Sequence, residues 1–265
     1  MNNNPKALFI SHGGGPMPLL GDEGHNEMID CLQGISNQIN KPSGIIVISA
    51  HWEEQATTIT ANASPSLIYD YSGFPKEAYD IQYACKGMPL LAEQLHGLFG
   101  SAGIKSKLDT QRGFDHGVFV PLKIMFPDAD IPCIQVSLVN SLDPKEHLKI
   151  GQAIKQLDVE NLLVIGSGFT FHNMKAFFAP HNKEVEFINT SFEHWLLNTC
   201  SNKEISESER VELLTNWEQA PGARYCHPRE EHLLPLHVCY GVAQSACSQT
   251  FEVKILNKKS SMYLW

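Results

Sequence analysis

This sequence of 265 residues lacks the features that mark membrane-spanning and nucleic-acid-binding chains. No stretch approaches the roughly 18 consecutive apolar residues that a transmembrane helix needs. The N-terminus has no basic region followed by an apolar one, so we expect neither a membrane partner nor a signal peptide. The sequence has no run of basic residues, and 20 Lys and Arg against 29 Asp and Glu give a net charge of −9. Because sequence-independent binding to nucleic acid needs a basic surface, we expect no nucleic-acid partner.

Paired cysteines are also missing. The seven cysteines are scattered, their number is odd, and no C-x-x-C pair occurs. This usage favours free thiols in a reducing compartment over a disulfide framework, so we expect a cytoplasmic protein whose cysteines behave as small buried hydrophobes. The sequence leaves a homo-oligomer open, because the apolar C-terminal Trp265 is compatible with packing inside the chain or against a neighbouring subunit.

Short apolar runs alternate with segments of helical periodicity along the chain. The apolar runs cover 7–11, 44–50, 132–138, 161–166 and 251–256, and the alternating segment 57–63 is typical of another strand. The helical segments cover 89–99, 143–157, 184–200 and 228–243. Runs that are apolar on both faces indicate strands covered by helices on both sides of a sheet. We therefore predict a single α/β domain over 1–265, with a central mixed or parallel sheet whose last strand is 251–256 and whose site lies at the C-terminal ends of the strands.

Twelve histidines are the unusual feature of the composition. His12, His51 and His172 each come at the end of an apolar run or after a short loop that follows one. We interpret the stretch VISAHWEE as a strand that delivers His51, its last side chain, to a cleft. One histidine in such a position is more often a hydrogen-bonded structural residue, whereas three in equivalent positions favour a site, since ligands of open α/β sheets bind at the strand ends.

A second group of histidines lies in PGARYCHPREEHLLPLHVCY, residues 221–240. His232 and His237 are five residues apart and do not share a helical face, which argues against both binding one ion. His227, Glu231 and His232 lie at the entry to a predicted helix, where a loop can direct one of them to the cleft.

These residue types predict a mononuclear metal site. Three neutral imidazoles suit Zn, Fe or Cu and leave a coordination position open, and a further histidine is a candidate general base. Hydrolysis and oxygen chemistry both remain open on this basis. The turn Gly13-Gly14-Gly15-Pro16 lacks the spacing of a phosphate loop, and we expect its glycines to let the backbone approach the site closely.

Two further stretches are typical of site loops. RGFDHG, residues 112–117, places Asp115 and His116 between glycines ahead of an apolar helix. YDYSGFPKEAYDIQY, residues 69–83, carries four tyrosines and one phenylalanine, and aromatic loops can form the wall of a pocket for an aromatic ligand. Asp115, Tyr71 and Phe74 are therefore candidate substrate contacts, with a structural turn and simple packing as the alternatives.

Taken in order, seven motifs resemble the class III extradiol ring-cleaving dioxygenases, in particular the small single-chain branch that includes the 4,5-DOPA dioxygenases. They are SHGGGP, VISAHWE, YSGFPKEAYD, RGFDHG, PDADIPCIQVS, GSGFTFHN and HPREEHLLPLH, and they span nearly the whole chain. The resemblance implies metal-binding histidines at His12, His51 and His232, a catalytic acid/base at His172, and at His116 a further catalytic-site histidine that contacts substrate or dioxygen.

More distant members of that superfamily use two histidines and one glutamate, so Glu231 is an alternative third ligand. The nearer branch carries histidine at the place of His232, which we favour. The present sequence departs from the branch in its three glycines before Pro16 and in His227 before Pro228. Both departures touch the mouth of the site, so the resemblance does not define the substrate.

The implied reaction opens the ring of a catechol with dioxygen on Fe(II), with His172 as the general base. The implied partners are O2 and a small aromatic diol, either L-DOPA or a related catechol. Zn(II) fits the same three histidines and is compatible with a preparation of an iron enzyme. The competing functions are a zinc hydrolase, which would activate water without oxygen, and a non-catalytic member, although every matched position still carries histidine.

Overall fold

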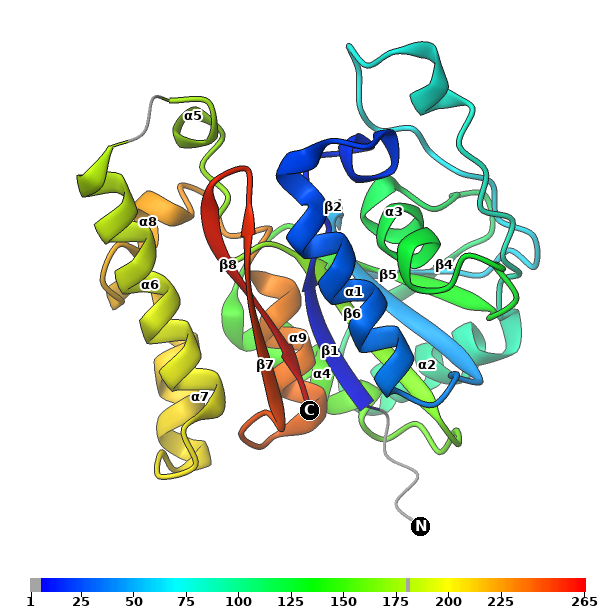
Figure 1. The fold of residues 1–265 in the computed structure, drawn as a ribbon. Coiled ribbons are helices and arrows are strands. Elements are labelled where there is room, and N and C mark those ends of the chain that lie inside the picture. The colour runs from blue at the N-terminus through cyan, green and yellow to red at the C-terminus, as the bar shows by residue number, and fades with distance from the viewer. Residues whose placement is uncertain (1–5, 180–181) are drawn as a thin grey trace.

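The computed structural model describes residues 6–179 and 182–265, and its centre is a mixed sheet (Figure 1). The strands are β1 (Lys6–Ser11), β2 (Gly44–Glu54), β3 (Thr57–Thr60), β4 (Ser106–Asp109), β5 (Cys133–Val139), β6 (Leu162–Gly168), β7 (Gln249–Ile255) and β8 (Lys258–Leu264). They form one eight-stranded sheet in the order β4-β3-β5-β2-β6-β1-β8-β7. The central strands β5, β2, β6 and β1 pair in parallel, whereas β8 pairs antiparallel with β1 and β7. The predicted single α/β domain with a mixed sheet is confirmed.

Helices cover both faces of this sheet (Figure 1). The α-helices are α1 (Asn26–Gln38), α2 (Pro89–Ser101), α3 (His116–Met125), α4 (Pro144–Ile154), α5 (Met174–Phe177), α6 (Lys183–Ser201), α7 (Glu207–Thr215), α8 (Ala223–Cys226) and α9 (Leu234–Ala243). The 3-10 helices are η1 (Met17–Leu20), η2 (Glu23–His25), η3 (Lys76–Tyr79) and η4 (Trp217–Gln219). Helix α9 packs on β1, β2 and β6, and α3 packs on β2 and β6.

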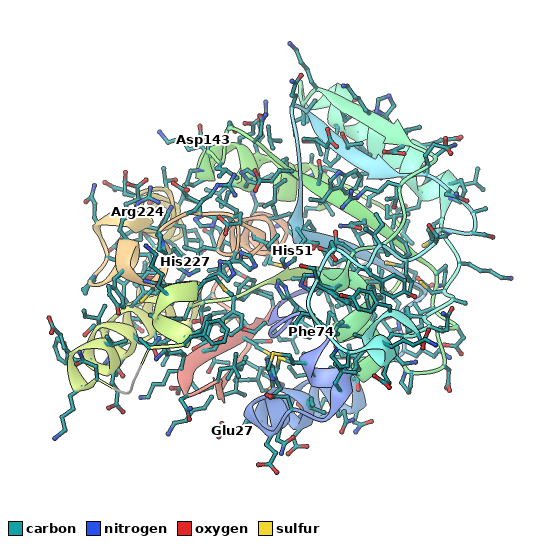
Figure 2. All side chains as sticks on the ribbon, turned by 90° about the horizontal axis from the view of Figure 1, so that it is seen from above. Glu27, His51, Phe74, Asp143, Arg224 and His227 are labelled. Atoms are coloured by element: carbon teal, nitrogen blue, oxygen red, sulfur yellow. The ribbon has the colours of Figure 1, made fainter. Side chains whose placement is uncertain are left out.

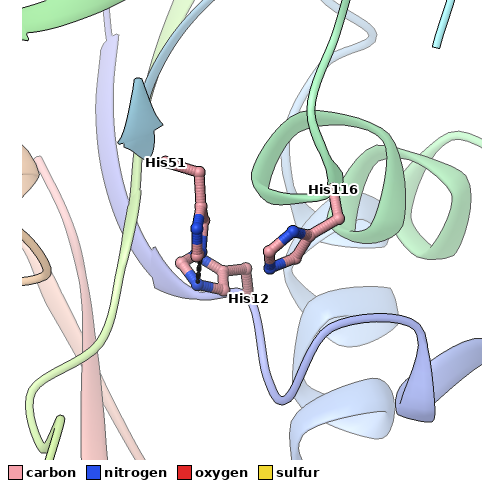
Figure 3. A group of neighbouring side chains, drawn as sticks. All are labelled: His12, His51 and His116. Carbon is pink, nitrogen blue, oxygen red and sulfur yellow. Dashed lines mark hydrogen bonds between the residues drawn. The ribbon is translucent and has the colours of Figure 1, made fainter. Parts of the chain in front are cut away.

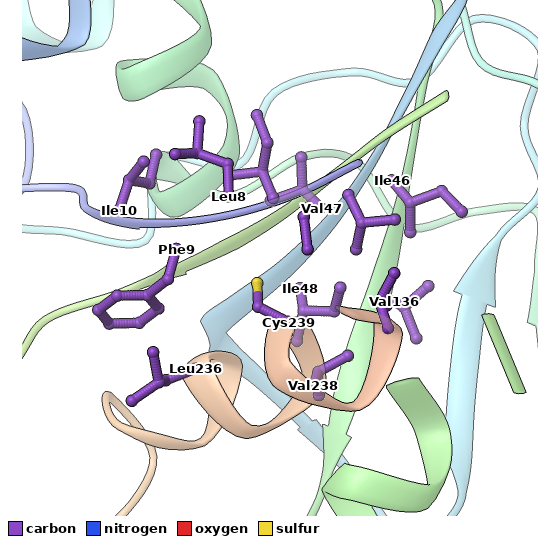
Figure 4. Packing of buried hydrophobic residues seen from close by; sticks show 14 of the residues in the cluster. Leu8, Phe9, Ile10, Ile46, Val47, Ile48, Val136, Leu236, Val238 and Cys239 are labelled. Carbon is purple, nitrogen blue, oxygen red and sulfur yellow. The ribbon is translucent and has the colours of Figure 1, made fainter. Parts of the chain in front are cut away.

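The core explains why the strand sequences are apolar without alternation. On β1, Phe9 points toward Leu236 of α9, while Leu8 and Ile10 point to the opposite side of the strand (Figure 4). These side chains are completely buried, so both faces of the strand contribute to the core. Burial of one such side chain stabilises the fold by about 1.5–3 kcal/mol relative to exposure. The central strands therefore form a rigid platform for the loops at their C-terminal ends.

The C-terminal hairpin corrects one prediction. The run at 251–256 is not the last strand, because β8 follows β7 after a two-residue turn at Leu256 and Asn257. Both residues have positive φ, 48° and 64°, which is the conformation that a tight hairpin turn of the I′ type needs and that glycine usually supplies. Strand β8 then inserts between β7 and β1, and the Trp265 indole donates to the Ser245 carbonyl. The C-terminal tryptophan thus packs on its own chain.

The start of α9 corrects a second prediction. We expected a helix from residue 228, but α9 begins at Leu234. The preceding residues run along the end of β6, where the Phe169 amide donates to the His232 carbonyl at 2.9 Å. This pairing holds the segment with Glu231 and His232 outside the helix and beside the strand ends.

Two compositional predictions can be compared with the structure. The seven cysteines are free thiols, and only Cys31 among them is not buried. Within the two described ranges, no helix has both the length and the apolar character required to cross a bilayer.

Candidate active site

Five histidines meet where β2, β6 and β1, three neighbouring parallel strands, end. His12 directly follows β1, His172 lies in the loop after β6, and His51 lies near the end of β2. The first residue of α3, His116, and the segment before α9, with His232, complete the group, which we call the histidine cluster. The sequence named all five of these residues as site candidates, and the fold brings them together.

His51 is not the last side chain of its strand, as we had expected, because β2 continues to Glu54. The pairing of β2 with β5 shifts register between Ile48 and Glu53, which marks a bulge around His51. Bulges of this kind occur next to active sites, where they redirect a side chain. The irregular strand therefore turns His51 toward the cluster.

His12, His51 and His116 form a group of neighbouring rings in the cluster (Figure 3). Their ligand atoms all lie within 4.8 Å of one another, so this group could hold a metal ion. The Nε2 atoms of His12 and His51 are 3.0 Å apart. Two nitrogen ligands about 2.0–2.1 Å from one ion, at angles between octahedral and tetrahedral, are about 2.9–3.4 Å apart. The spacing of these two rings therefore fits a shared metal ion.

A hydroxyl fixes the tautomer of His12. The Ser167 hydroxyl donates its only hydrogen to the Gly117 carbonyl at 2.5 Å. It must therefore accept from His12 Nδ1, which lies 3.0 Å away. The proton of the neutral ring is then on Nδ1, and the lone pair of Nε2 faces the cluster, as a metal ligand requires.

Asp70, in the aromatic loop, holds the outer side of two further rings. Its Oδ1 accepts from both the backbone amide and Nδ1 of His116, at 3.0 and 2.8 Å. Its Oδ2 lies 3.7 Å from Nδ1 of His51. Burial raises the pKa of Asp70, but the hydrogen bonds and charge of His116 outweigh it and leave the pKa below its ordinary value. We therefore expect an ionised carboxylate that holds the Nδ1 proton of His116 and directs the Nε2 atom of that ring inward.

Glu231 plays the same part for the other two rings. Its Oε1 lies 3.0 Å from Nδ1 of His232 and 3.2 Å from Nδ1 of His172, and these two rings stack with centroids 3.3 Å apart. Burial raises the pKa of Glu231, yet the hydrogen bonds from both histidines bring it far below its usual range. The second carboxylate oxygen of Glu231, Oε2, forms an ion pair with Arg229. Arg229 also forms a bidentate ion pair with Glu53.

Burial favours the neutral form of three of these rings, His12, His51 and His232. Desolvation, followed by repulsion from neighbouring histidines, holds the pKa values of His12 and His51 well below the ordinary value. Burial and the charge of His172 likewise lower the pKa of His232 to about 3. Since only the neutral imidazole offers a lone pair, these rings are ready to bind a metal ion at neutral pH.

The cluster forms the floor of a cavity of about 240 Å³. Large apolar side chains from several loops surround it, and we call them the cavity wall. They are Tyr71, Phe74, Phe169, Phe177 and Phe178, with Met17, Met174 and Leu256. The two aromatic residues that the sequence named as substrate contacts, Tyr71 and Phe74, are thus part of this wall, and the backbone of Gly13–Gly15 lies against it.

Two histidines that the sequence singled out lie elsewhere. His227 follows α8, apart from His51 (Figure 2), and its Nε2 donates to the Thr170 carbonyl. Burial lowers the pKa of His227 to about 3. His237 is buried in α9, and its Nε2 donates to the Leu214 carbonyl. Neither ring lines the cavity.

Asp115 does not line the cavity either. It is completely buried beneath the cluster, where it accepts hydrogen bonds from Ser49, Arg112 and Gln135. The Arg112 guanidinium also lies over the Trp52 ring, 4.5 Å from its centroid. Asp115 therefore ties β2 and β5 to the start of α3, which places His51 and His116 through the backbone.

Sequence reasoning missed the oxygen partners of the cluster. Asp70 lies in the aromatic loop with a tyrosine on each side of it in the sequence, and Ser167 lies within an apolar strand. A polar residue within such a run is the available signal. Its partner, however, is 155 positions away in the case of Ser167 and His12.

Comparisons with known proteins agree with this geometry. A family model described as the catalytic LigB subunit of aromatic ring-opening dioxygenase matches residues 6–264. The dioxygenase tasH of Hapsidospora irregularis is 39% identical over 254 residues, which cover 89% of this chain and 78% of that protein. A 4,5-DOPA dioxygenase extradiol of Beta vulgaris is 36% identical over 245 residues, which cover 91% of this chain and 88% of that protein.

A solved structure of an uncharacterized protein from Escherichia coli K12 has the same fold, with a TM-score of 0.74 and 27% identity. The match covers 98% of this chain and 99% of that one. The chain belongs to the LigB family of aromatic ring-opening dioxygenases, a family of metal-dependent enzymes.

The buried position of Asp115 generates a stability prediction. We expect Asp115→Ala to lower the free energy of unfolding by about 3 kcal/mol, because it leaves the Arg112 guanidinium without its buried partner. Urea unfolding followed by circular dichroism measures the change. A substrate contact would behave differently: an unchanged free energy of unfolding with a raised KM for substrate would contradict the structural role.

Proposed function

We propose that this member of the family is an extradiol dioxygenase that uses a bound metal ion and O2 to open the ring of a small catechol beside its diol. The observation that carries the proposal is the floor of the cavity, where neutral imidazole nitrogens face a space walled by aromatic side chains. Relatives named as 4,5-DOPA dioxygenases support the same chemistry. The free thiols suit a reducing compartment, and we propose the cytoplasm.

We propose His12, His51 and His232 as the metal ligands. With nitrogens about 2.0–2.1 Å from one ion, three imidazole centroids would lie about 4.5–5.3 Å from one another. The centroids of this trio are 4.8, 5.2 and 5.0 Å apart. His116, by contrast, has its centroid 3.9 Å from that of His51, closer than two ligands of one ion allow. His116 is therefore left to contact a reactant.

Fe(II) is the metal we expect in this site. Three neutral nitrogen donors with coordination positions left open suit iron, and when bound it supplies the electron exchange between the diol and dioxygen that no side chain can perform. Zn(II) fits the same nitrogens but has no redox chemistry. The protein's own contribution is to bind and orient the reactants and to move protons.

His172 is the proposed general base. Glu231 holds its Nδ1, so its Nε2 is left to accept a proton from a hydroxyl of the diol. The same carboxylate stabilises the imidazolium that forms, as the orienting acid does in other catalytic triads. His116 is oriented by Asp70 in an equivalent way and offers its Nε2 to substrate or dioxygen. The cavity wall fixes the ring and limits the access of water.

Oxygen uptake tests the proposed reaction. Protein purified without oxygen and loaded with Fe(II) should consume O2 with a panel of catechols and form a yellow ring-opened product in equal amount. An electrode and an absorbance spectrum measure both. Bound iron without uptake on any catechol would exclude the reaction, and ester or amide hydrolysis by the zinc-loaded protein would then identify a hydrolase.

The ligand assignment predicts which variants lose metal. His12→Ala, His51→Ala and His232→Ala should each lose the bound ion, because each removes one of three donors, whereas His116→Ala should keep it. Elemental analysis after dialysis measures the metal content. Iron retained at full occupancy in His232→Ala and lost in His116→Ala would instead make His116 the third ligand.

The role of His172 predicts a different outcome. We expect His172→Ala to keep the metal and to lose turnover by about 10²–10⁴-fold, the usual contribution of a general base. His194→Ala, at an exposed position on α6, is the matched control and should retain both properties. A metal-free His172→Ala protein would show that His172 is a ligand.

A further inference from the structure

The cavity has polar groups on its floor and almost none free on its wall. The Tyr71 hydroxyl donates to the Ala78 carbonyl at 2.6 Å, so this ring presents carbon atoms to the cavity. In the glycine turn, the Gly14 amide donates to Nε2 of His25 at 3.0 Å, and Asp22 holds the other nitrogen of that ring. The Tyr71 hydroxyl and the Gly14 amide are therefore already paired within the protein and are not available to a substituent on the catechol.

The described residues that line this cavity also carry no fixed positive charge. Among the described residues, no lysine or arginine lines it. The carboxylates of Asp70 and Glu231 lie directly behind the histidines of the floor. A substrate that brought a carboxylate into the cavity would lose hydration without gaining an ion pair, which is unfavourable.

The lysines of this region line a neighbouring cavity. Lys254, Lys258 and Lys259 belong to the β7–β8 hairpin and border a space of about 350 Å³. Phe177 and Leu256 line both cavities and stand between the two. Two apolar side chains, Phe177 and Leu256, thus separate the lysines of the hairpin from the cavity above the histidine cluster.

Resting on the proposed function, we infer that the substrate is a catechol with an uncharged, apolar substituent, and that the cavity wall selects against catechols bearing a carboxylate, L-DOPA included. The floor binds the diol that all catechols share. Each methylene of the substituent that moves from water onto the cavity wall should strengthen binding by up to about 0.8 kcal/mol, or fourfold in affinity. A carboxylate at the same position would contact the carbon atoms of aromatic rings, which offer it no hydrogen bond.

Anaerobic calorimetry tests this inference without turnover. Fe(II)-loaded protein is titrated under nitrogen with methyl-, ethyl- and propylcatechol and with dihydrocaffeate, which matches propylcatechol in length and carries a carboxylate. We expect affinity to rise along the alkyl series and propylcatechol to bind about tenfold more tightly than dihydrocaffeate. Equal or tighter binding of dihydrocaffeate would overturn the inference, and its weakening in Lys258→Ala would place the anion in the lysine-lined cavity.

A charge introduced at the wall provides a matched pair of variants. Phe178 lines the cavity and is 74% exposed, so arginine fits there without disturbing the core. Phe187 is 72% exposed and does not line the cavity. Phe178→Arg should reduce the preference for propylcatechol about two- to fivefold, the range of an exposed ion pair, and Phe187→Arg should leave it unchanged. An equal effect of both variants would contradict a role for the wall.

Admitting oxygen to the same samples separates the two proposals. A preference for the neutral catechol without any oxygen uptake would support the selectivity of the cavity wall and reject the dioxygenase. Oxygen uptake that favours dihydrocaffeate would support the dioxygenase and overturn the inference. Failure of every catechol to bind would overturn both.

Discussion

The oxygen atom beside Nδ1 of each cluster histidine is the contact on which the site depends. A neutral imidazole carries one proton, and an acceptor on the outer side of the ring keeps that proton away from the centre. Ser167 does this for His12, Asp70 does it for His116, and Glu231 does it for both His172 and His232. The lone pairs of the Nε2 atoms then point toward a common centre, and such an arrangement can stabilise a cation. Burial alone would give neutral rings without this common direction.

The sheet makes these contacts possible because backbone segments approach one another closely at the strand ends. A Cβ atom on Gly168, at the end of β6, would lie 2.1 Å from the His232 carbonyl oxygen. One on Gly117 would lie 2.3 Å from the Ser49 hydroxyl. Glycine is thus required where α3 and the segment before α9 contact the platform. The positions of His116 and His232 follow from this packing more than from the side chains themselves.

The sequence was sufficient for the parts of the structure that depend on short-range pattern. Apolar runs predicted the central strands, and histidines at their ends predicted the place of the site. The sequence did not predict contacts between distant segments. No short-range pattern connects Asp70 to His116, for example. Strand β8 was missed because Leu256 and Asn257 adopt a turn that usually contains glycine. The burial of Asp115 was beyond sequence reasoning for a similar reason, since a buried and an exposed carboxylate look alike in a sequence.

The floor and the wall of the cavity have different origins in the fold. The floor is built on parallel strands whose positions the core fixes, and the match to the family model covers these strands. The wall comes from η1, the aromatic loop, α5 and the hairpin turn at Leu256, all of them connections between elements of the sheet. Loops vary among relatives far more readily than the elements they join. Relatives can therefore share one ring-opening chemistry and accept different catechols, so the specificity of this chain has to be argued from its own wall rather than from the names of its relatives.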